Sequence, residues 1–145
     1  VSEWRCRVTL VTSPRTPEVA YAHLLPLAAR HGEAVSVIDF RTAGPGSIEG
    51  AFDCDLLLIT SDSMSMMTEA AVSRRPAIAL APARVRPNKD DEAVAGLVAA
   101  RWLTVLPLAG TNAGALVDAA VALRPIDHNH LDRLADLLGA AAASK

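Results

Sequence analysis

Short apolar runs alternate along the chain with longer segments of mixed polarity. Five of these runs are rich in Val, Ile and Leu and are continuous rather than strictly alternating, as in strands covered on both faces. They predict strands at Arg7–Thr12, Ala34–Asp39, Asp55–Thr60, Pro76–Ala81 and Leu103–Leu106.

The segments between and after these runs carry helix start and stop signals. Thr16 and Pro17 suit the cap and the first position of a helix, and His31 with Gly32 suits its end. The predicted helices are Pro17–Arg30, Ser63–Ser73, Lys89–Ala100, Asn112–Leu123 and Asp127–Ala140. Strands that alternate with helices predict parallel βαβ units. The predicted fold class is therefore α/β, a three-layer α/β/α Rossmann-like sandwich with a five-stranded parallel sheet.

The connection between the second and third predicted strands departs from this alternation. Its sequence, RTAGPGSIEGAFDC, carries three glycines and a proline, which predicts at most one short helix. We expect the third and fourth strands at the centre of the sheet. Otherwise the central strands should be their neighbours, on either side of the first strand.

The composition narrows the class of protein. The 145 residues are 51% hydrophobic and 21% charged, which is typical of a single soluble domain, 1–145. The net charge of −2, without a basic stripe, argues against a nucleic-acid partner. The apolar runs are far shorter than the roughly 20 residues of a membrane span. No signal peptide is visible, so we expect a cytoplasmic protein in which Cys6 and Cys54 stay reduced.

Two loops at the expected carboxyl ends of strands carry candidate ligand-binding residues. The first loop, TSPRT (Thr12–Thr16), offers the hydroxyls of Ser13 and Thr16, the guanidinium of Arg15 and free amides at a helix start. This combination suits a phosphate. The alternative is a plain helix cap with an exposed arginine. The chain has no G-x-G-x-x-G, so we expect no dinucleotide cofactor.

The second loop follows the third predicted strand and opens the next helix. Its candidate residues are Ser61, Asp62, Ser63, Met64 and Ser65. Ser63 is the predicted N-cap. At 100° per residue the methionines share one arc with Ala70 and Ala71, which predicts core contacts rather than a metal or cofactor site. Val72 is the apolar exception on the polar side.

Glu69 falls on the polar side of this helix, beside Ser65. There its carboxylate can accept hydrogen bonds from a vicinal diol such as a ribose, or it is an ordinary solvated glutamate. Asp62 competes with an anion for the helix amides, so it either caps the helix, binds a sugar hydroxyl or helps to hold a cation. The remaining candidates are weaker. The two histidines of HNH (His128–His130) do not lie on one face of a helix, so they are not expected to bind a metal together. The segment Arg84–Glu92 is a predicted loop after the fourth strand, and its cations lie near the strand ends where a ligand is expected.

These loops resemble a known family. The segment VTSPRTP, followed further along by DLLLITSDSMSMMTEAAVSRRPAIAL, is similar to the mitochondrial-fission family named for elongated mitochondria. The resemblance runs from about Val8 to Leu106 and is closest to bacterial members, whose expected architecture is that of glycosyltransferase-B. Plant members of the family act in organelle division, and we do not infer that role for this chain.

More distantly, the second loop resembles the nucleotide-sugar half of glycosyltransferase-B enzymes. In those enzymes a small-residue loop at a helix start holds the diphosphate, and a glutamate holds the ribose. The resemblance implies that Ser63 to Met66 form the loop and that Glu69 binds the ribose. Ser63 stands where those enzymes commonly have glycine. The half that usually supplies the catalytic base is absent, so the chain resembles the carboxy-terminal domain alone and no catalytic residue is assigned.

We therefore expect a nucleotide-sugar-binding domain whose ligand is a nucleoside diphosphate sugar, without a metal or other cofactor. Transferase activity is expected only with the missing amino-terminal domain. In the site, Ser13 and Arg15 should converge with Ser61, Ser63 and Ser65 on one crevice that Glu69 lines. The alternatives are a non-catalytic protein-interaction module and a metal-dependent hydrolase that uses Asp62.

The first residue is Val rather than Met, so the chain is expected to be the excised part of a longer protein. A surface that once met a partner domain should then expose apolar side chains. We expect them near the carboxyl ends of the strands or along Leu131, Leu134 and Leu138.

Overall fold

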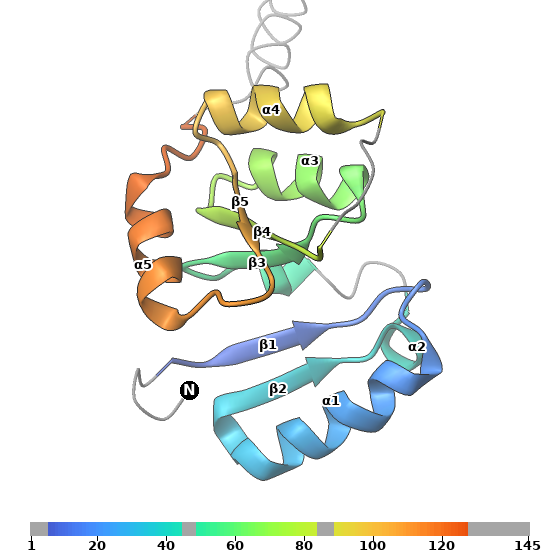
Figure 1. The fold of residues 1–145 in the computed structure, drawn as a ribbon. Coiled ribbons are helices and arrows are strands. Elements are labelled where there is room, and N and C mark those ends of the chain that lie inside the picture. The colour runs from blue at the N-terminus through green and yellow to red at the C-terminus, as the bar shows by residue number, and fades with distance from the viewer. Residues whose placement is uncertain (1–5, 45–48, 84–88, 128–145) are drawn as a thin grey trace, which may run out of the picture. The chain divides into compact units, whose positions relative to one another are not determined.

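The computed structural model describes residues 6–44, 49–83 and 89–127 (Figure 1). The chain divides into two compact units, Val1–Asp53 and Cys54–Lys145, which we call unit 1 and unit 2. Each unit contains its own parallel sheet, and each is described separately.

Unit 1 is a single βαβ motif followed by short helical turns (Figure 1). Its elements are β1 (Val8–Val11), α1 (Glu18–His31), the 3₁₀ turn η1 (Gly32–Ala34), β2 (Val35–Ile38), α2 (Phe40–Ala43) and the 3₁₀ turn η2 (Glu49–Phe52). β1 and β2 pair in parallel, from Val8 opposite Val35 to Val11 opposite Ile38. α1 ends at Gly32, whose φ of 54° is the left-handed conformation that glycine adopts without strain.

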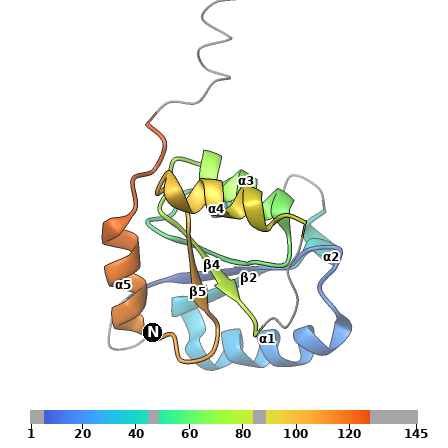
Figure 2. The same cartoon turned by 45° about the horizontal axis from the view of Figure 1, so that its top comes forward.

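The described residues of unit 2 form a three-stranded parallel sheet and three helices (Figure 2). Its elements are β3 (Leu57–Thr60), α3 (Met64–Val72), β4 (Ala77–Ala81), α4 (Asp91–Ala99), β5 (Thr104–Pro107) and α5 (Ala113–Ala122). The strand order is β3-β4-β5, so β4 is central and β5 is an edge strand. α3 and α4 pack side by side, and α5 contacts β4.

The core of unit 2 is built from small and flexible apolar residues. Ala77, Ile78 and Ala79 of β4 are completely buried, as strand continuity predicts for a sheet covered on both faces. Met67 and Ala70 of α3 pack with Ala77 and Ala79, while Ile78 points to the other face. Met67 is thus a core contact, as predicted from the helix arc, and the half-buried Met64 also packs against this cluster; Met66 is half-buried and Val72 is exposed.

The predicted elements are confirmed over most of the described chain, with ends shifted by a few residues. Asn112 caps α5 by accepting a hydrogen bond from the Ala115 amide. Two expectations were wrong. Thr16 does not cap α1, which begins at Glu18 after Pro17 without a side-chain cap. The glycine-rich connection contributes to two short helices, α2 and the 3₁₀ helix η2, rather than at most one.

The predicted sheet is confirmed only in its parallel pairing. The strands lie in two parallel sheets, of two and three strands, and a single five-stranded sheet stays a prediction. The alternation of strands and helices predicts parallel pairing, but the glycine-rich connection 41–54 supplies no crossover helix to dictate which strands become neighbours. The predicted helix Asp127–Ala140, the segment His128–His130 and the leucines of the expected apolar surface lie at or beyond the end of the described residues.

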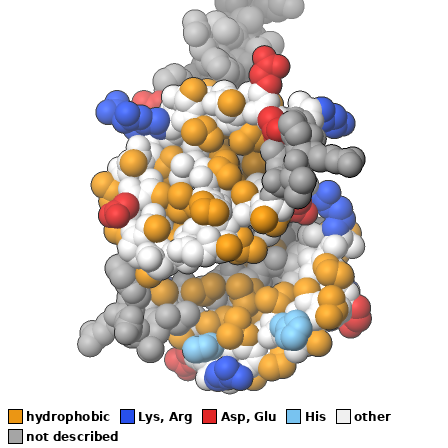
Figure 3. Space-filling view, in the orientation of Figure 1, with side chains coloured by type: hydrophobic (Ala, Val, Ile, Leu, Met, Phe, Trp, Pro, Cys, Tyr) orange, Lys and Arg blue, Asp and Glu red, His pale blue; other side chains and the backbone are white. Residues whose placement is uncertain are grey.

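Large apolar side chains are exposed in both units (Figure 3). Val11 at the carboxyl end of β1 is 41% exposed, and Leu108, just after β5, is 57% exposed. Exposed apolar residues of this kind are common on globular proteins, so on their own they do not mark the surface expected to meet a partner domain. Within the described segments, no helix has the length and apolar character needed to cross a membrane.

Candidate functional site

The second loop turns the chain from β3 into α3. The Ser61 amide donates to the Leu80 carbonyl and so extends the ladder by one residue beyond β3. Ser63 is 5% exposed, and its hydroxyl accepts a hydrogen bond from the Met66 amide at 3.4 Å. This confirms Ser63 as the N-cap. The amides of Met64 and Ser65 precede the first intrahelical bond, so position alone leaves them without an intrahelical acceptor.

Ser65 and Glu69 form a polar pair on the exposed side of α3. The Ser65 hydroxyl donates to Glu69 Oε1 at 2.9 Å, and the two residues are one helical turn apart in the sequence. Both side chains are exposed. Among the described residues, none other is seen to donate to this carboxylate, and it can therefore accept further hydrogen bonds from a ligand.

Asp62 lies exposed at the tip of the second loop. Ser63, and not Asp62, supplies the cap of α3. In the part of the chain that the structure describes, no group of three or more His, Cys, Asp or Glu side chains is arranged to hold a metal ion. The hydrolase alternative therefore gains no support from the geometry.

The first loop uses much of its polar capacity internally. The Ser13 amide donates to the Thr16 hydroxyl at 2.9 Å, and the Arg15 amide donates to the Ser13 hydroxyl at 3.2 Å. The Thr16 amide closes a turn onto the Ser13 carbonyl. These three amides belong to the loop itself; the amides expected to be free are those of the helix start, and α1 begins at Glu18 without a side-chain cap. What this loop still offers is the exposed Arg15 and two hydroxyl protons.

A network that sequence reasoning missed lies beside the first loop in unit 1. Thr12 is 3% exposed, and its hydroxyl accepts hydrogen bonds from the Tyr21 hydroxyl and the Phe40 amide, each at 3.0 Å. Arg41 stacks on the Tyr21 ring at 3.4 Å from the centroid. The one available signal was Asp39 at the end of an apolar run, two residues before Arg41.

Arg41 is the charged centre of this network. It contacts Asp39 at 2.7 Å and Glu18 at 3.0 Å, and so joins the end of β2 to the first turn of α1. Hydrogen bonds from the Arg41 side chain hold the pKa of Asp39 below its usual value of 3.8. The hydrogen bond to Asp39 in turn raises the pKa of Arg41 above its usual range. The network occupies this guanidinium, which leaves Arg15 as the more available cation near the first loop.

The predicted site residues thus fall into two groups. Ser13, Arg15 and Thr16 belong to unit 1, while Ser61 to Ser65 and Glu69 belong to unit 2. The structure brings together Ser63, Ser65 and Glu69 around the start of α3. Convergence of the two groups on one crevice stays a prediction.

Comparison with known proteins identifies the family. The profile of the family described as mitochondrial fission ELM1 matches residues 1–137. The chain belongs to the ELM1 family. This match confirms the resemblance first noticed in the two loops and extends it over both units.

The comparisons leave the activity of this ELM1 family member open. No curated protein and no solved structure matches the chain. The glycosyltransferase-B architecture, the bacterial character and the nucleotide-sugar ligand therefore remain predictions from the sequence.

Proposed function

We propose that this ELM1 family member binds a nucleoside diphosphate sugar at the start of α3. The single observation that carries the proposal is the exposed Ser65–Glu69 pair, one turn inside a helix whose first amides have no intrahelical acceptor. The amides of Met64 and Ser65 suit the diphosphate, because helix starts favour anions. The Glu69 carboxylate suits the ribose diol, to which it offers charge-assisted hydrogen bonds.

The finer arrangement is also a proposal. We infer from the alternation of strands and helices that the five strands belong to one α/β/α sandwich and one domain, with Ser13, Arg15 and Thr16 on the same ligand edge as the second loop. In a single sheet, every interior strand forms hydrogen bonds with a neighbouring strand along both of its edges. Amide hydrogen exchange tests this: β1 and β3 should both be protected at successive residues. Exchange of alternate amides in either strand would contradict the single sheet.

The proposal concerns binding and assigns no catalytic residue. A glycosyl transfer would need a group that removes a proton from the acceptor, and the resemblance places that group in an amino-terminal domain. The competing function is a protein-interaction module that retains the fold without a nucleotide ligand. Such a module is not expected to bind nucleotides, so nucleotides should leave its melting temperature unchanged.

A thermal-shift panel of nucleoside diphosphates and their sugars separates these two functions. A ligand present at about 100 times its dissociation constant should stabilise the fold by about 2.7 kcal/mol. The panel should include each base as the diphosphate and the same base as the monophosphate, because the proposal requires the diphosphate to bind more tightly. A melting temperature that no member of the panel raises would support the interaction module.

Calorimetric titration of Glu69→Ala then tests the ribose assignment. Loss of a charge-assisted hydrogen bond of about 1.5–3 kcal/mol should weaken binding roughly tenfold to a hundredfold. Ser65→Ala should weaken it less, since neighbouring amides still contact the phosphate. Glu92→Ala, which removes an exposed glutamate from α4, is the matched control and should bind like the parent. If Glu69→Ala binds like the parent but melts several degrees lower, Glu69 has a structural role only.

A further inference from the structure

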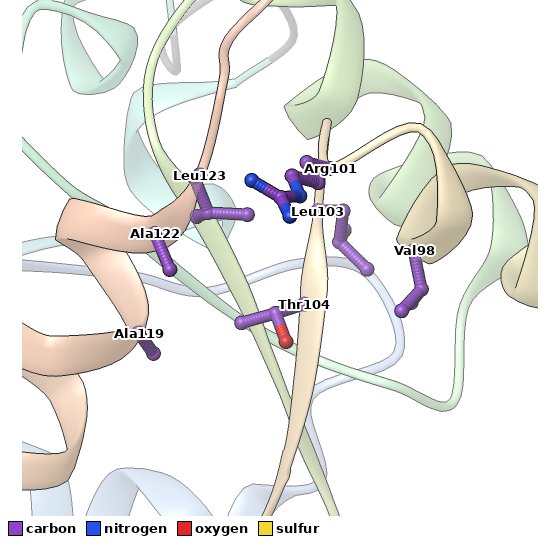
Figure 4. Close-up of a pocket in the computed structure, with 7 residues that line it drawn as sticks. All are labelled: Val98, Arg101, Leu103, Thr104, Ala119, Ala122 and Leu123. Atoms are coloured by element: carbon purple, nitrogen blue, oxygen red, sulfur yellow. The ribbon is translucent and has the colours of Figure 1, made fainter.

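Unit 2 contains an apolar groove at the amino end of β5 (Figure 4). It has a volume of about 250 Å³ and is lined by Val98, Arg101, Leu103, Thr104, Ala119, Ala122 and Leu123. These residues come from the end of α4, the start of β5 and the end of α5, so the groove lies beside the edge strand of the sheet. The proposed nucleotide site lies at the carboxyl ends of the same parallel strands, which is the opposite end of the sheet.

Arg101 supplies the charge of the groove. Within the described residues, no acid is seen to form an ion pair with its guanidinium, in contrast to Arg41, which pairs with Glu18 and Asp39. Figure 4 shows the Arg101 side chain extending toward Leu123, across the apolar lining. The Arg124 amide donates to the Arg101 carbonyl at 2.8 Å and ties the chain after α5 to this position.

The backbone at Arg101 makes the presence of an arginine unusual. The Arg101 amide donates to the Val98 carbonyl and the Trp102 amide to the Leu97 carbonyl, which is the Schellman arrangement at the end of α4. Arg101 occupies the position that this motif usually gives to glycine, with a φ of 59°. Arg74, just after α3, has the same left-handed conformation with a φ of 66°, so this backbone has a conformational cost but does not by itself indicate a ligand.

The lining defines the chemistry of a ligand. Leu103 is fully buried beneath the groove, so the aliphatic surface that a ligand can reach comes from Val98 and Leu123. An apolar body removes this surface from water, and an anionic head can accept hydrogen bonds from Arg101. The volume is below the roughly 300–1,000 Å³ of pockets for drug-sized ligands, which excludes a nucleotide sugar and favours a short chain.

We propose that this groove binds a short aliphatic carboxylate, with the alkyl chain against Val98 and Leu123 and the carboxylate on Arg101. The charge complementarity between a carboxylate and a guanidinium without an acidic partner in the described segments selects this ligand over a neutral one. The proposal is independent of the nucleotide site, because the two sites share no residue.

Titration of the whole chain with hexanoate at neutral pH, followed by methyl NMR, tests this proposal. Hexanoate should shift the methyl resonances of Val98, Leu103 and Leu123 in a saturable manner. Hexan-1-ol keeps the chain but lacks the charge, and acetate keeps the charge but lacks the chain. Each should bind at least about tenfold more weakly than hexanoate. Equal binding of acetate would reduce the site to an exposed arginine and overturn the proposal.

Arg101→Gly distinguishes the ligand role from a structural one. The variant relieves the left-handed backbone, so it should melt at a higher temperature than the parent and yet lose hexanoate binding by about tenfold or more. Arg101→Lys, which keeps the charge and the strain, should retain part of the binding. Unchanged hexanoate affinity in Arg101→Gly would overturn the proposal.

Ala119→Leu fills the groove from α5 and should abolish the methyl shifts without removing a charge. Nuclear Overhauser contacts from Val98 or Leu123 to residues 128–145, or to a second copy of the chain, would mean that protein occupies the groove. Overhauser contacts of either kind would contradict a small-molecule site.

Discussion

The first and second loops have similar sequences and different hydrogen-bond arrangements. Both leave a parallel strand, both are rich in hydroxyls, and both precede a helix. In the first loop the hydroxyls of Ser13 and Thr16 accept from amides of the same loop. In the second loop Ser63 takes one helix amide, and Ser65 turns outward to Glu69. The number of hydroxyls in a loop therefore says little about ligand binding until their acceptors are known.

The difference has a physical origin in the helix starts. α3 begins with a side-chain cap at Ser63, which fixes the first turn and leaves the outer face of that turn for other contacts. α1 begins at Glu18, after Pro17, without a side-chain cap, and its entry is instead held by the closed turn of the first loop. The first loop is consequently tied to the stability of unit 1, and the second loop carries the more open polar surface.

The largest effect on this comparison is expected from Thr12→Val. The substitution keeps the shape of the side chain but removes the acceptor of the Tyr21 hydroxyl and of the Phe40 amide. A buried donor left without a partner costs about 1–3 kcal/mol. Chemical denaturation should show a loss of that size. Tyr21→Phe, which removes donor and requirement together, should cost less.

Thr12→Val also tests whether the two loops are separate in function. If the first loop is mainly structural, nucleotide affinity extrapolated to fully folded protein should stay unchanged in this variant. A parent-like midpoint of denaturation would instead show that the buried hydrogen bonds around Thr12 contribute little to stability.

The second expected effect is at Ser63, where a matched pair of variants separates capping from ligand binding. Ser63→Ala removes the cap of α3 and should cost about 0.5–2 kcal/mol. Ser63→Asp keeps a capping oxygen and should restore most of this stability. Its negative charge at the helix start should nevertheless weaken diphosphate binding, because carboxylate and phosphate compete for the same amides. Diphosphate binding by Ser63→Asp as tight as by the parent would remove the helix start from the site.

Much of the fold could be predicted from the sequence, because its signals are local. Continuous apolar runs placed the five strands, and Ser63 and Asn112 marked helix starts that the structure confirms. Thr16 was misassigned because a Thr-Pro pair resembles a cap, whereas its hydroxyl accepts from the Ser13 amide within the loop. Local pattern cannot distinguish these two acceptor roles.

The network of Thr12, Tyr21, Asp39 and Arg41 escaped prediction for a different reason. Thr12 and Phe40 are 28 residues apart, and only the parallel pairing of β1 with β2 brings them together. The groove at Arg101 was equally out of reach, since it depends on the left-handed backbone at that residue and on the ends of α4 and α5. Contacts between distant segments follow from register and packing, which the sequence alone did not specify.

The smallest effect is expected from the charge of Asp39, and it appears as a pH dependence. The pKa of Asp39 is lowered in the folded chain, mainly by hydrogen bonds from Arg41, so the unfolded chain binds more protons in the range just below the usual value of 3.8. Stability therefore rises with pH in that range, is fully present above it, and is lost as the pH falls through the folded-state pKa. The Arg41 side chain is 43% exposed, so solvent and salt should screen the effect. Denaturation midpoints measured from about pH 6 to about pH 3 should fall more steeply for the parent than for Asp39→Asn. Asp118→Asn, at an exposed aspartate of α5, serves as the control and should follow the parent. Parallel curves for the parent and Asp39→Asn would show that the Asp39–Arg41 pair adds nothing measurable to the structure beside the first loop.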